Sequence, residues 1–251
     1  MTYRFADCRF ELLDPTAGDR MYQEGHVPGA ASLDLDRDLS DLGRAPAEGR
    51  HPLPDAESFA ASASRAGIGP GVLVVAYDQG MTGGAARLWW LLRHFGHEDV
   101  AVLDGGLAVW RGPLRSGPEE MEPASFEPRL READRVEADE LLARLGEPGL
   151  VLVDARAPER FRGEVEPLDP VAGHIPGAVN APSGQGIPPP ALEAEELVAY
   201  CGSGVVACVA LLELARAGRP DAKLYAGSWS EWSRRGLPVE RGEAGSRRGL
   251  R

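Results

Sequence analysis

The stretch LVAYCGSGVVAC, residues 197–208, decides the fold. Four residues of strand type lead into Cys201, two glycines follow within three positions, and an apolar run with helical spacing begins directly afterwards. Strand, tight turn and helix in this order are typical of a mainly parallel sheet with crossover helices. Ligands of such sheets bind beyond the C-terminal ends of the strands, so Cys201 stands where a functional site is expected.

The residues after Cys201 are small, and this suggests how the thiol is used. A thiol reacts as the thiolate, and no Lys, Arg or His lies within five residues of Cys201. Gly202 and Gly204 permit a tight turn with positive φ, so successive N–H groups can converge on one point ahead of the positive end of a helix. We therefore expect backbone amides to stabilise an anion on Cys201, with a buried structural cysteine as the alternative.

A repeated set of segments predicts two similar units. Each copy alternates short apolar runs with segments of helical spacing, which predicts the α/β class with two tandem domains. Each domain is expected to contain a mainly parallel sheet flanked by helices on both faces. The pairs, in the same order in both copies, are GHVPGA (25–30) and GHIPGA (173–178), VLVVAYDQG (72–80) and EELVAYCGS (195–203), and VAVLDGGLAVW (100–110) and AKLYAGSWSEW (222–232).

A polar, proline-rich stretch separates the two copies. We predict a first domain over residues 1–117, a linker over 118–134 and a catalytic second domain over 135–251. The second copy is shorter between its histidine and its cysteine, near SGQGIPPP at 183–190. A deletion or an absent mobile segment would each account for the difference.

Composition excludes several classes of function. The chain has 27 basic and 39 acidic residues, a net charge of −12, which argues against a nucleic-acid surface. It has no run of 18 apolar residues and no signal-peptide core, so we expect no membrane partner. Three cysteines suit a reducing cytoplasm better than a disulfide framework. No spacing of Cys or His typical of zinc is present, and we expect no metal and no cofactor.

Together these motifs resemble the two-domain rhodanese sulfurtransferases, which include thiosulfate and 3-mercaptopyruvate sulfurtransferases. The resemblance rests on the two Gly-His-x-Pro-Gly-Ala turns, on VLDGGLAVW, on DARAPERFRGEVEP (154–167) and on CGSGVVA in the second copy only. In this family the second rhodanese-like domain carries the active cysteine and the first has lost it, often to aspartate. Asp78 fits that pattern.

The resemblance implies a reaction for Cys201. Its thiolate would attack the sulfane sulfur of a small-molecule donor and form a persulfide, held by the N–H groups of Gly202, Gly204, Val205 and Val206. A thiophilic acceptor such as cyanide, a small thiol or reduced thioredoxin would then remove the sulfur. We expect the protein to act as a monomer.

Ser203 bears on the choice of donor. Thiosulfate-specialised relatives tend to carry basic residues inside this loop, whereas those that use mercaptopyruvate resemble CGSG. In the latter, the serine works with a histidine and an aspartate of the first domain to polarise the donor. The resemblance implies that His26 is this histidine, with Asp14 or Asp19 as its acidic partner.

Arg160, in ERFRG, matches a family arginine that binds the anionic end of the donor. A guanidinium suits a carboxylate or sulfonate because it can donate two parallel hydrogen bonds. Some mercaptopyruvate enzymes have a second arginine about nine residues further on. Asp169 stands in that region here, which predicts weaker mercaptopyruvate binding.

The remaining candidates have structural interpretations. His174 is expected to be a turn histidine bonded to nearby backbone, and Cys8 and Cys208 are expected to pack in the core. A cysteine phosphatase of similar architecture would need an arginine at the end of the loop, where this chain has Ala207. A non-catalytic sulfur carrier or regulatory module is the other alternative, and the intact second loop argues against it.

Overall fold

The computed structural model describes residues 2–243, which form two compact units. The first unit contains the chain up to Gly43 and Leu53–Glu132. The second contains Arg44–Pro52 and the chain from Ala133 onward. A short segment from the N-terminal half therefore belongs to the second unit. The boundaries of 1–117, 118–134 and 135–251 stay a prediction.

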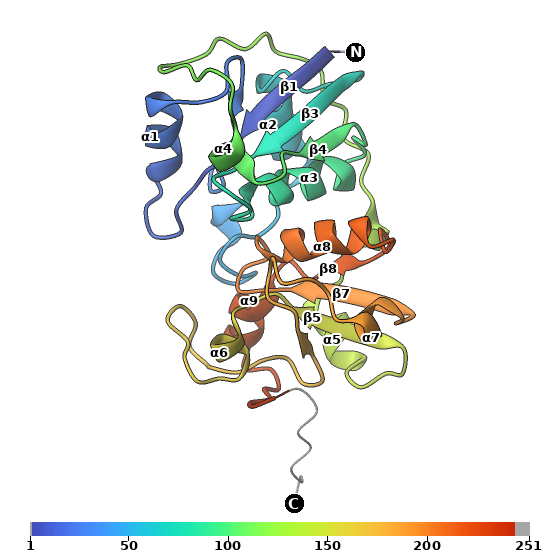
Figure 1. Cartoon of the computed structure of the whole chain (residues 1–251). Helices are drawn as coiled ribbons and strands as arrows, with labels where there is room; N and C mark the ends of the chain where they lie inside the picture. The colour runs from blue at the N-terminus through green and yellow to red at the C-terminus, as the bar shows by residue number, and fades with distance from the viewer. Residues whose placement is uncertain (1, 244–251) are drawn as a thin grey trace, which may run out of the picture. The chain divides into compact units, whose positions relative to one another are not determined.

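The first unit is built on a parallel sheet with strand order β2-β1-β3-β4. In register, β1 lies beside β3 from Thr2 opposite Val72 to Asp7 opposite Tyr77. Helices connect the strands and pack against the sheet (Figure 1). The strands are β1 (Thr2–Asp7), β2 (Ala31–Ser32), β3 (Val72–Tyr77) and β4 (Val100–Val102), and the helices are α1 (Ala17–Glu24), α2 (Ala56–Arg65), α3 (Gly84–His94) and α4 (Gly106–Val109).

The second unit repeats this topology with the order β6-β5-β7-β8, again with parallel strands. The predicted α/β class and the two tandem parallel sheets are thereby confirmed. The strands are β5 (Leu150–Asp154), β6 (Val179–Asn180), β7 (Glu196–Tyr200) and β8 (Lys223–Leu224), and the helices are α5 (Ala138–Ala143), α6 (Pro158–Phe161), α7 (Pro189–Leu192), α8 (Ala207–Arg216) and α9 (Ser228–Arg234). Two 3-10 turns, Leu42–Arg44 and Glu132–Asp134, complete the described elements.

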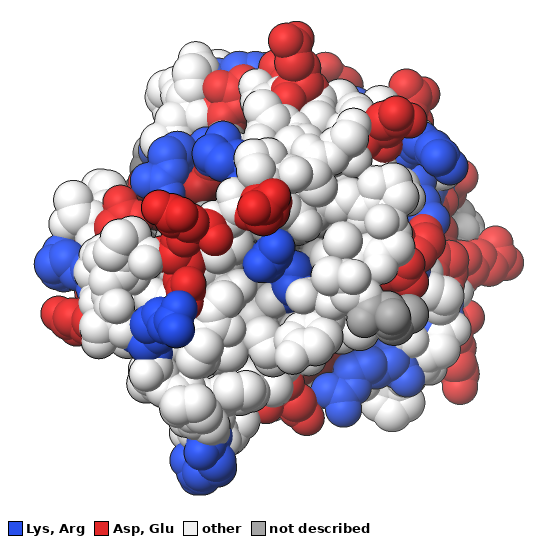
Figure 2. All heavy atoms as spheres, turned by 90° about the horizontal axis from the view of Figure 1, so that it is seen from above, with Lys and Arg blue, Asp and Glu red and all other residues white. Residues whose placement is uncertain are grey.

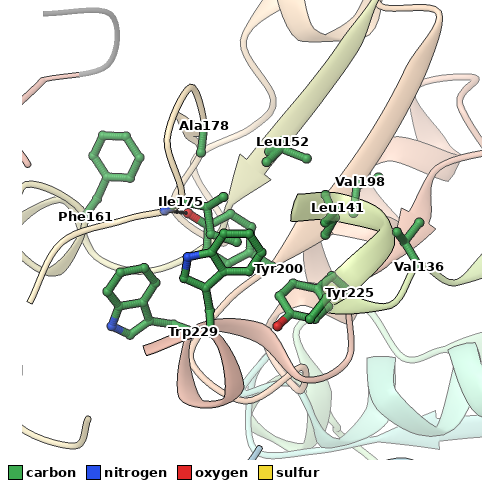
Figure 3. Packing of buried hydrophobic residues seen from close by; sticks show 12 residues of the cluster. Val136, Leu141, Leu152, Phe161, Ile175, Ala178, Val198, Tyr200, Tyr225 and Trp229 are labelled. Atoms are coloured by element: carbon green, nitrogen blue, oxygen red, sulfur yellow. Dashed lines mark hydrogen bonds between the residues drawn. The ribbon is translucent and has the colours of Figure 1, made fainter. Parts of the chain in front are cut away.

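An aromatic core supports the end of β7 in the second unit (Figure 3). Tyr200, the last residue of β7, is fully buried, and its hydroxyl accepts a hydrogen bond of 3.1 Å from the N–H of Ile175. Trp229 on α9 is also fully buried and donates its indole N–H to the carbonyl oxygen of Val171 at 2.8 Å. Buried aromatic rings with paired polar atoms form a rigid base. The residue that follows Tyr200 is Cys201.

Each unit contains a matching ion pair beside its own sheet. Arg9 is 2.6 Å from Asp7, and Arg156 is 2.6 Å from Asp154. The same guanidinium also donates to the carbonyl oxygen of the glycine that precedes the turn histidine. Arg9 donates to Gly25 and Arg156 donates to Gly173, each at 2.7 Å. Each arginine therefore ties the end of a strand to the repeated turn.

Charge is mixed on the surface. On the face that Figure 2 shows, acidic and basic side chains are interspersed, with no continuous field of basic ones among the residues described. Within residues 2–243, no helix is long and apolar enough to cross a membrane.

Candidate active site

The loop Cys201–Val206 connects the end of β7 to the start of α8 and carries the predicted nucleophile. Gly204 has a φ of +77°, and a side chain there would collide with the carbonyl oxygen of Ala226. The turn therefore requires glycine at this position. Cys201 is a free thiol, 3% exposed, at the start of the turn.

The backbone amides of this loop are largely unpaired. The N–H groups of Gly202, Ser203, Val205 and Val206 donate no hydrogen bond to any residue in the described part of the chain. A buried N–H group without an acceptor costs about 1–3 kcal/mol. Successive N–H groups of this kind, placed ahead of a helix, are an arrangement in which proteins bind negative charge.

Helix α9 holds the opposite side of the loop. The N–H of Cys201 donates to Oγ of Ser228 at 3.1 Å, and the N–H of Trp229 donates to the carbonyl oxygen of Cys201 at 3.0 Å. The N–H of Ser230 donates to the carbonyl oxygen of Gly202 at 2.9 Å. Ser228 has a φ of +53°, an unfavourable conformation for a residue with a side chain. These bonds fix the backbone that carries the thiol.

Ser203 is bonded to His51, a histidine that was not among the residues predicted for the site. Nδ1 of His51 lies 2.9 Å from Oγ of Ser203, and both residues are buried. His51 belongs to Arg44–Pro52, the segment that joins the second unit. A hydroxyl fixed by an imidazole is suited to polarising a carbonyl oxygen.

The expectation that His26 pairs with Ser203 is therefore corrected. The His26 ring is fully buried in the first unit, stacks on Tyr22 with ring centroids 3.9 Å apart, and bonds the carbonyl oxygen of Tyr22 through Nδ1 at 2.7 Å. His174 repeats the arrangement on Phe161, with centroids 3.7 Å apart and Nδ1 at 2.7 Å from the carbonyl oxygen. Both are turn histidines, as expected for His174.

The two acids considered as partners of His26 are engaged elsewhere. Asp14 forms an ion pair of 2.9 Å with Arg20. Asp19 lies 3.3 Å from Arg37. The acidic group nearest to His26 in the described structure is Glu119, whose Oε1 lies 3.5 Å from Nε2. Neither aspartate is placed to orient His26.

Arg160 on α6 reaches the loop beside the thiol. Its Nη1 and Nη2 lie 3.4 and 3.5 Å from the position that a Cβ atom on Gly202 would take. Glu166 holds the guanidinium through a bond of 2.7 Å to Nη2. The expectation that only backbone amides stabilise an anion at Cys201 is therefore too narrow, because a cation distant in sequence lies next to the loop.

The other two cysteines have packing roles. Burial raises the pKa of the Cys8 thiol well above its usual value, and the neighbouring Asp7 adds to the effect. Cys208 is fully buried and its Sγ donates to the carbonyl oxygen of Gly204 at 3.3 Å. Cys201 is left as the candidate nucleophile. No cluster of potential metal ligands is found among residues 2–243.

The site thus combines four chemical functions within one unit. It has a thiol, a set of unpaired amides, a hydroxyl bonded to an imidazole, and a guanidinium. Such a set can support attack by a thiolate on an anionic donor that has a carbonyl group.

Comparison with known proteins agrees with this geometry. The family model described as "Rhodanese-like domain" matches residues 2–112 and 137–235. A probable 3-mercaptopyruvate sulfurtransferase from Pseudomonas aeruginosa is 48% identical over 248 residues, covering 90% of this chain and 87% of the relative. A putative thiosulfate sulfurtransferase from Mycobacterium tuberculosis is 42% identical, covering 95% and 90%.

A solved structure of the same kind is also similar. The crystal structure of SseA from Escherichia coli, described with the rhodanese fold and the mechanism of 3-mercaptopyruvate sulfotransferases, matches with a TM-score of 0.75 at 33% identity. The match covers 90% of this chain and 92% of the other. The similarity therefore extends over both units.

Proposed function

Because this chain belongs to the rhodanese family and is a sulfurtransferase, we propose that it takes sulfur from 3-mercaptopyruvate through a persulfide on Cys201. The observation that supports this assignment most directly is the bond between Ser203 and His51 beside the loop of unpaired amides. A fixed hydroxyl serves a donor with a carbonyl group. Mercaptopyruvate has this group and thiosulfate does not.

The first half-reaction transfers the donor sulfur to the protein. The Cys201 thiolate supplies the electron pair of a new S–S bond to the sulfur of mercaptopyruvate. The C–S bond breaks, and its electron pair passes to the pyruvate fragment as an enolate. A proton then converts the enolate to pyruvate, and a persulfide remains on Cys201. The unpaired loop amides stabilise the negative charge of that persulfide.

Ser203 and Arg160 act on the two oxygen-bearing ends of the donor. The hydroxyl of Ser203, oriented by His51, donates to the carbonyl oxygen that gains charge as the enolate forms. Arg160 binds the carboxylate, for which a planar guanidinium is well suited. The contact of Ser203 favours departure of the pyruvate fragment, and the contact of Arg160 holds the donor in place.

The second half-reaction returns Cys201 to the thiolate. A thiophilic acceptor attacks the outer sulfur, and the S–S electron pair passes back to Cys201. Cyanide, a small thiol and reduced thioredoxin are acceptors of this class. A reducing compartment such as the cytoplasm would keep the three free cysteines as thiols. The chain carries all four chemical functions within one unit, which suits a monomer.

Thiosulfate is the second candidate donor, and one relative with that name is 42% identical. It offers a dianion to the cation beside the loop but has no carbonyl group for Ser203. We expect thiosulfate to be used less efficiently than mercaptopyruvate.

Mass spectrometry tests the assignment. After treatment with 3-mercaptopyruvate, the protein is expected to gain one sulfur on Cys201 and to release pyruvate. Cys201→Ser should do neither, whereas the control Cys208→Ser should retain both. An unmodified Cys201 in a protein that still releases pyruvate would contradict the mechanism.

A further inference from the structure

A second guanidinium group, that of Arg50, lies against Gly202 and was not among the residues predicted for the site. A methyl group on Gly202 would come within 2.7 Å of Nη2 of Arg50, closer than it would come to either terminal nitrogen of Arg160. Arg50 has no counterpart among the repeated motifs. Its side chain occupies space beside the loop that exists because residue 202 is glycine.

Arg50 is held at both its backbone and its side chain. Its N–H donates to Oγ of Ser230 at 3.0 Å, and Ser230 in turn donates to the carbonyl oxygen of Gly202. Nη1 of Arg50 forms an ion pair and hydrogen bond with Asp169, whose side chain is fully buried. A long side chain that is already ordered loses less conformational entropy when it binds a ligand.

The cluster around Asp169 has more positive than negative charge. Its carboxylate lies 3.2 Å from Arg234 and 3.5 Å from Arg160, in addition to the pair with Arg50. Arg160 is also paired with Glu166 at 2.7 Å. Three guanidinium groups therefore share two carboxylates within the described structure.

One further arginine does not change this balance. Arg156 lies 3.3 Å from Glu166, but it is neutralised by its own ion pair of 2.6 Å with Asp154. One positive charge remains in excess in a partly buried region. Electrostatic attraction is stronger there than in bulk water, so the region favours an anion.

We propose that Arg50 is a second donor-binding residue, which together with Arg160 binds the carboxylate of 3-mercaptopyruvate. This inference rests on the proposed function, which supplies the anionic donor. Asp169 is a positioning residue that orients Arg50. An aspartate stands where some relatives have an arginine, and this replacement predicted weaker mercaptopyruvate binding. In this chain the second cation comes from Arg50, and the aspartate supports it.

The test compares steady-state kinetics of Arg50→Ala with wild type, using 3-mercaptopyruvate as donor and cyanide as acceptor. We expect the KM for mercaptopyruvate to rise about 10- to 100-fold, with kcat changed less than about threefold. The KM for cyanide should stay unchanged, because cyanide reacts after the pyruvate fragment has left. Arg162→Ala is the matched control, since Arg162 pairs with Glu164 on the same segment as Arg160.

Asp169→Asn tests the positioning role. It should raise the KM for mercaptopyruvate by a smaller factor than Arg50→Ala, with kcat retained. The exchanged double variant Arg50→Asp with Asp169→Arg restores the ion pair and places the cation at residue 169. It should bind mercaptopyruvate more tightly than Arg50→Ala does.

Direct binding separates the proposal from folding defects. In the Cys201→Ser background, which cannot consume the donor, calorimetric titration with 3-mercaptopyruvate should give a higher Kd for Arg50→Gln. Arg50→Gln keeps much of the side-chain length, and its melting temperature would show that it folds. An active wild type with an unchanged Kd and KM in the Arg50 variants would overturn the inference alone. A wild type that forms no persulfide would overturn the proposed function instead.

Discussion

The loops that follow β3 and β7 occupy equivalent places in the two units, but their backbone N–H groups differ in their hydrogen-bond partners. Asp78–Gly83 precedes α3 and Cys201–Val206 precedes α8, so the two turns have the same length. Each has a left-handed residue at the fourth position, with φ +66° at Met81 and +77° at Gly204. The main chain therefore has the same hand at the fourth position of both loops, but it differs at the sixth, where Gly83 has a φ of +114° and Val206 a φ of −67°.

The difference lies in the residue at the end of the strand. In the first unit the carboxylate of Asp78 accepts hydrogen bonds from the N–H groups of Gly80, Met81, Gly83 and Ala85 at 2.7 to 3.3 Å. The second unit has a cysteine in this place and leaves most of its loop amides unpaired within the described residues. The first loop thus demonstrates that this turn binds a negative charge. Under the proposed function, the amides of the second loop would stabilise the charge that forms on Cys201 during the reaction.

Cys201→Asp should produce the largest effect on activity. It places a carboxylate at the start of the second loop, as Asp78 does in the first. Sulfur transfer should fall by at least about 10³-fold, since no nucleophile remains to form the persulfide. The melting temperature should rise, because a carboxylate would accept hydrogen bonds from unpaired amides. Pyruvate release and thermal unfolding measure the two effects. A lower melting temperature than that of Cys201→Ala would refute the anion-binding interpretation of the loop.

The next largest effect is the difference in kcat/KM between variants of His51 and variants of His26. His51→Ala should lower kcat/KM for mercaptopyruvate by about 10²-fold, because Ser203 loses the group that orients it. His51→Asn should lose less, since the amide can replace Nδ1. His26→Asn should retain kcat/KM in the folded protein, because His26 bonds the backbone of Tyr22 in helix α1 of the first unit. Equal losses from His51→Ala and His26→Asn would reject the assignment of His51.

Asp78→Ala should reduce stability with a smaller effect on activity. Removing the carboxylate leaves buried N–H groups without an acceptor, which is expected to cost about 2–4 kcal/mol in free energy of unfolding. The kcat of the folded protein should remain near that of wild type. Urea denaturation measures the loss. Asp78→Asn keeps one acceptor oxygen, so its free energy of unfolding should lie between those of wild type and Asp78→Ala. Unchanged stability in Asp78→Ala would show that these bonds contribute little.

The sheets, the repeat and the loop could be predicted because each depends on local pattern. Apolar runs, the paired turn motifs and the glycines around Cys201 all report on nearby backbone. His51 and Arg50 could not be found in this way. They lie in Arg44–Pro52, which reaches the loop through tertiary packing, and neither belongs to a repeated motif.

The repeat itself contained a signal about His26. A histidine present in the same turn of both units, one of which lacks the cysteine, performs a task common to both. That task is structural, as the matching bonds of His26 and His174 demonstrate. A histidine without a repeated partner, such as His51, was the better candidate for chemistry. The role of Asp169 could not be predicted from the sequence either, because it depends on an ion pair with Arg50, which is distant in sequence.

The smallest predicted effect concerns His174, in the repeated turn of the second unit, and the way the free energy of unfolding changes with pH. Burial lowers the pKa of His174 below its usual value, so the ring stays neutral in the folded protein at pH values where it gains a proton in the unfolded chain. Its contribution to stability is therefore complete above about pH 6.5 and is lost as the pH falls toward the folded-state pKa. His174→Asn keeps a donor for the carbonyl oxygen of Phe161 but does not titrate. Its free energy of unfolding should decline less than that of wild type between pH 7 and pH 5, measured by urea denaturation about every half unit. Parallel declines in the two proteins would show that His174 is not a source of the acid sensitivity.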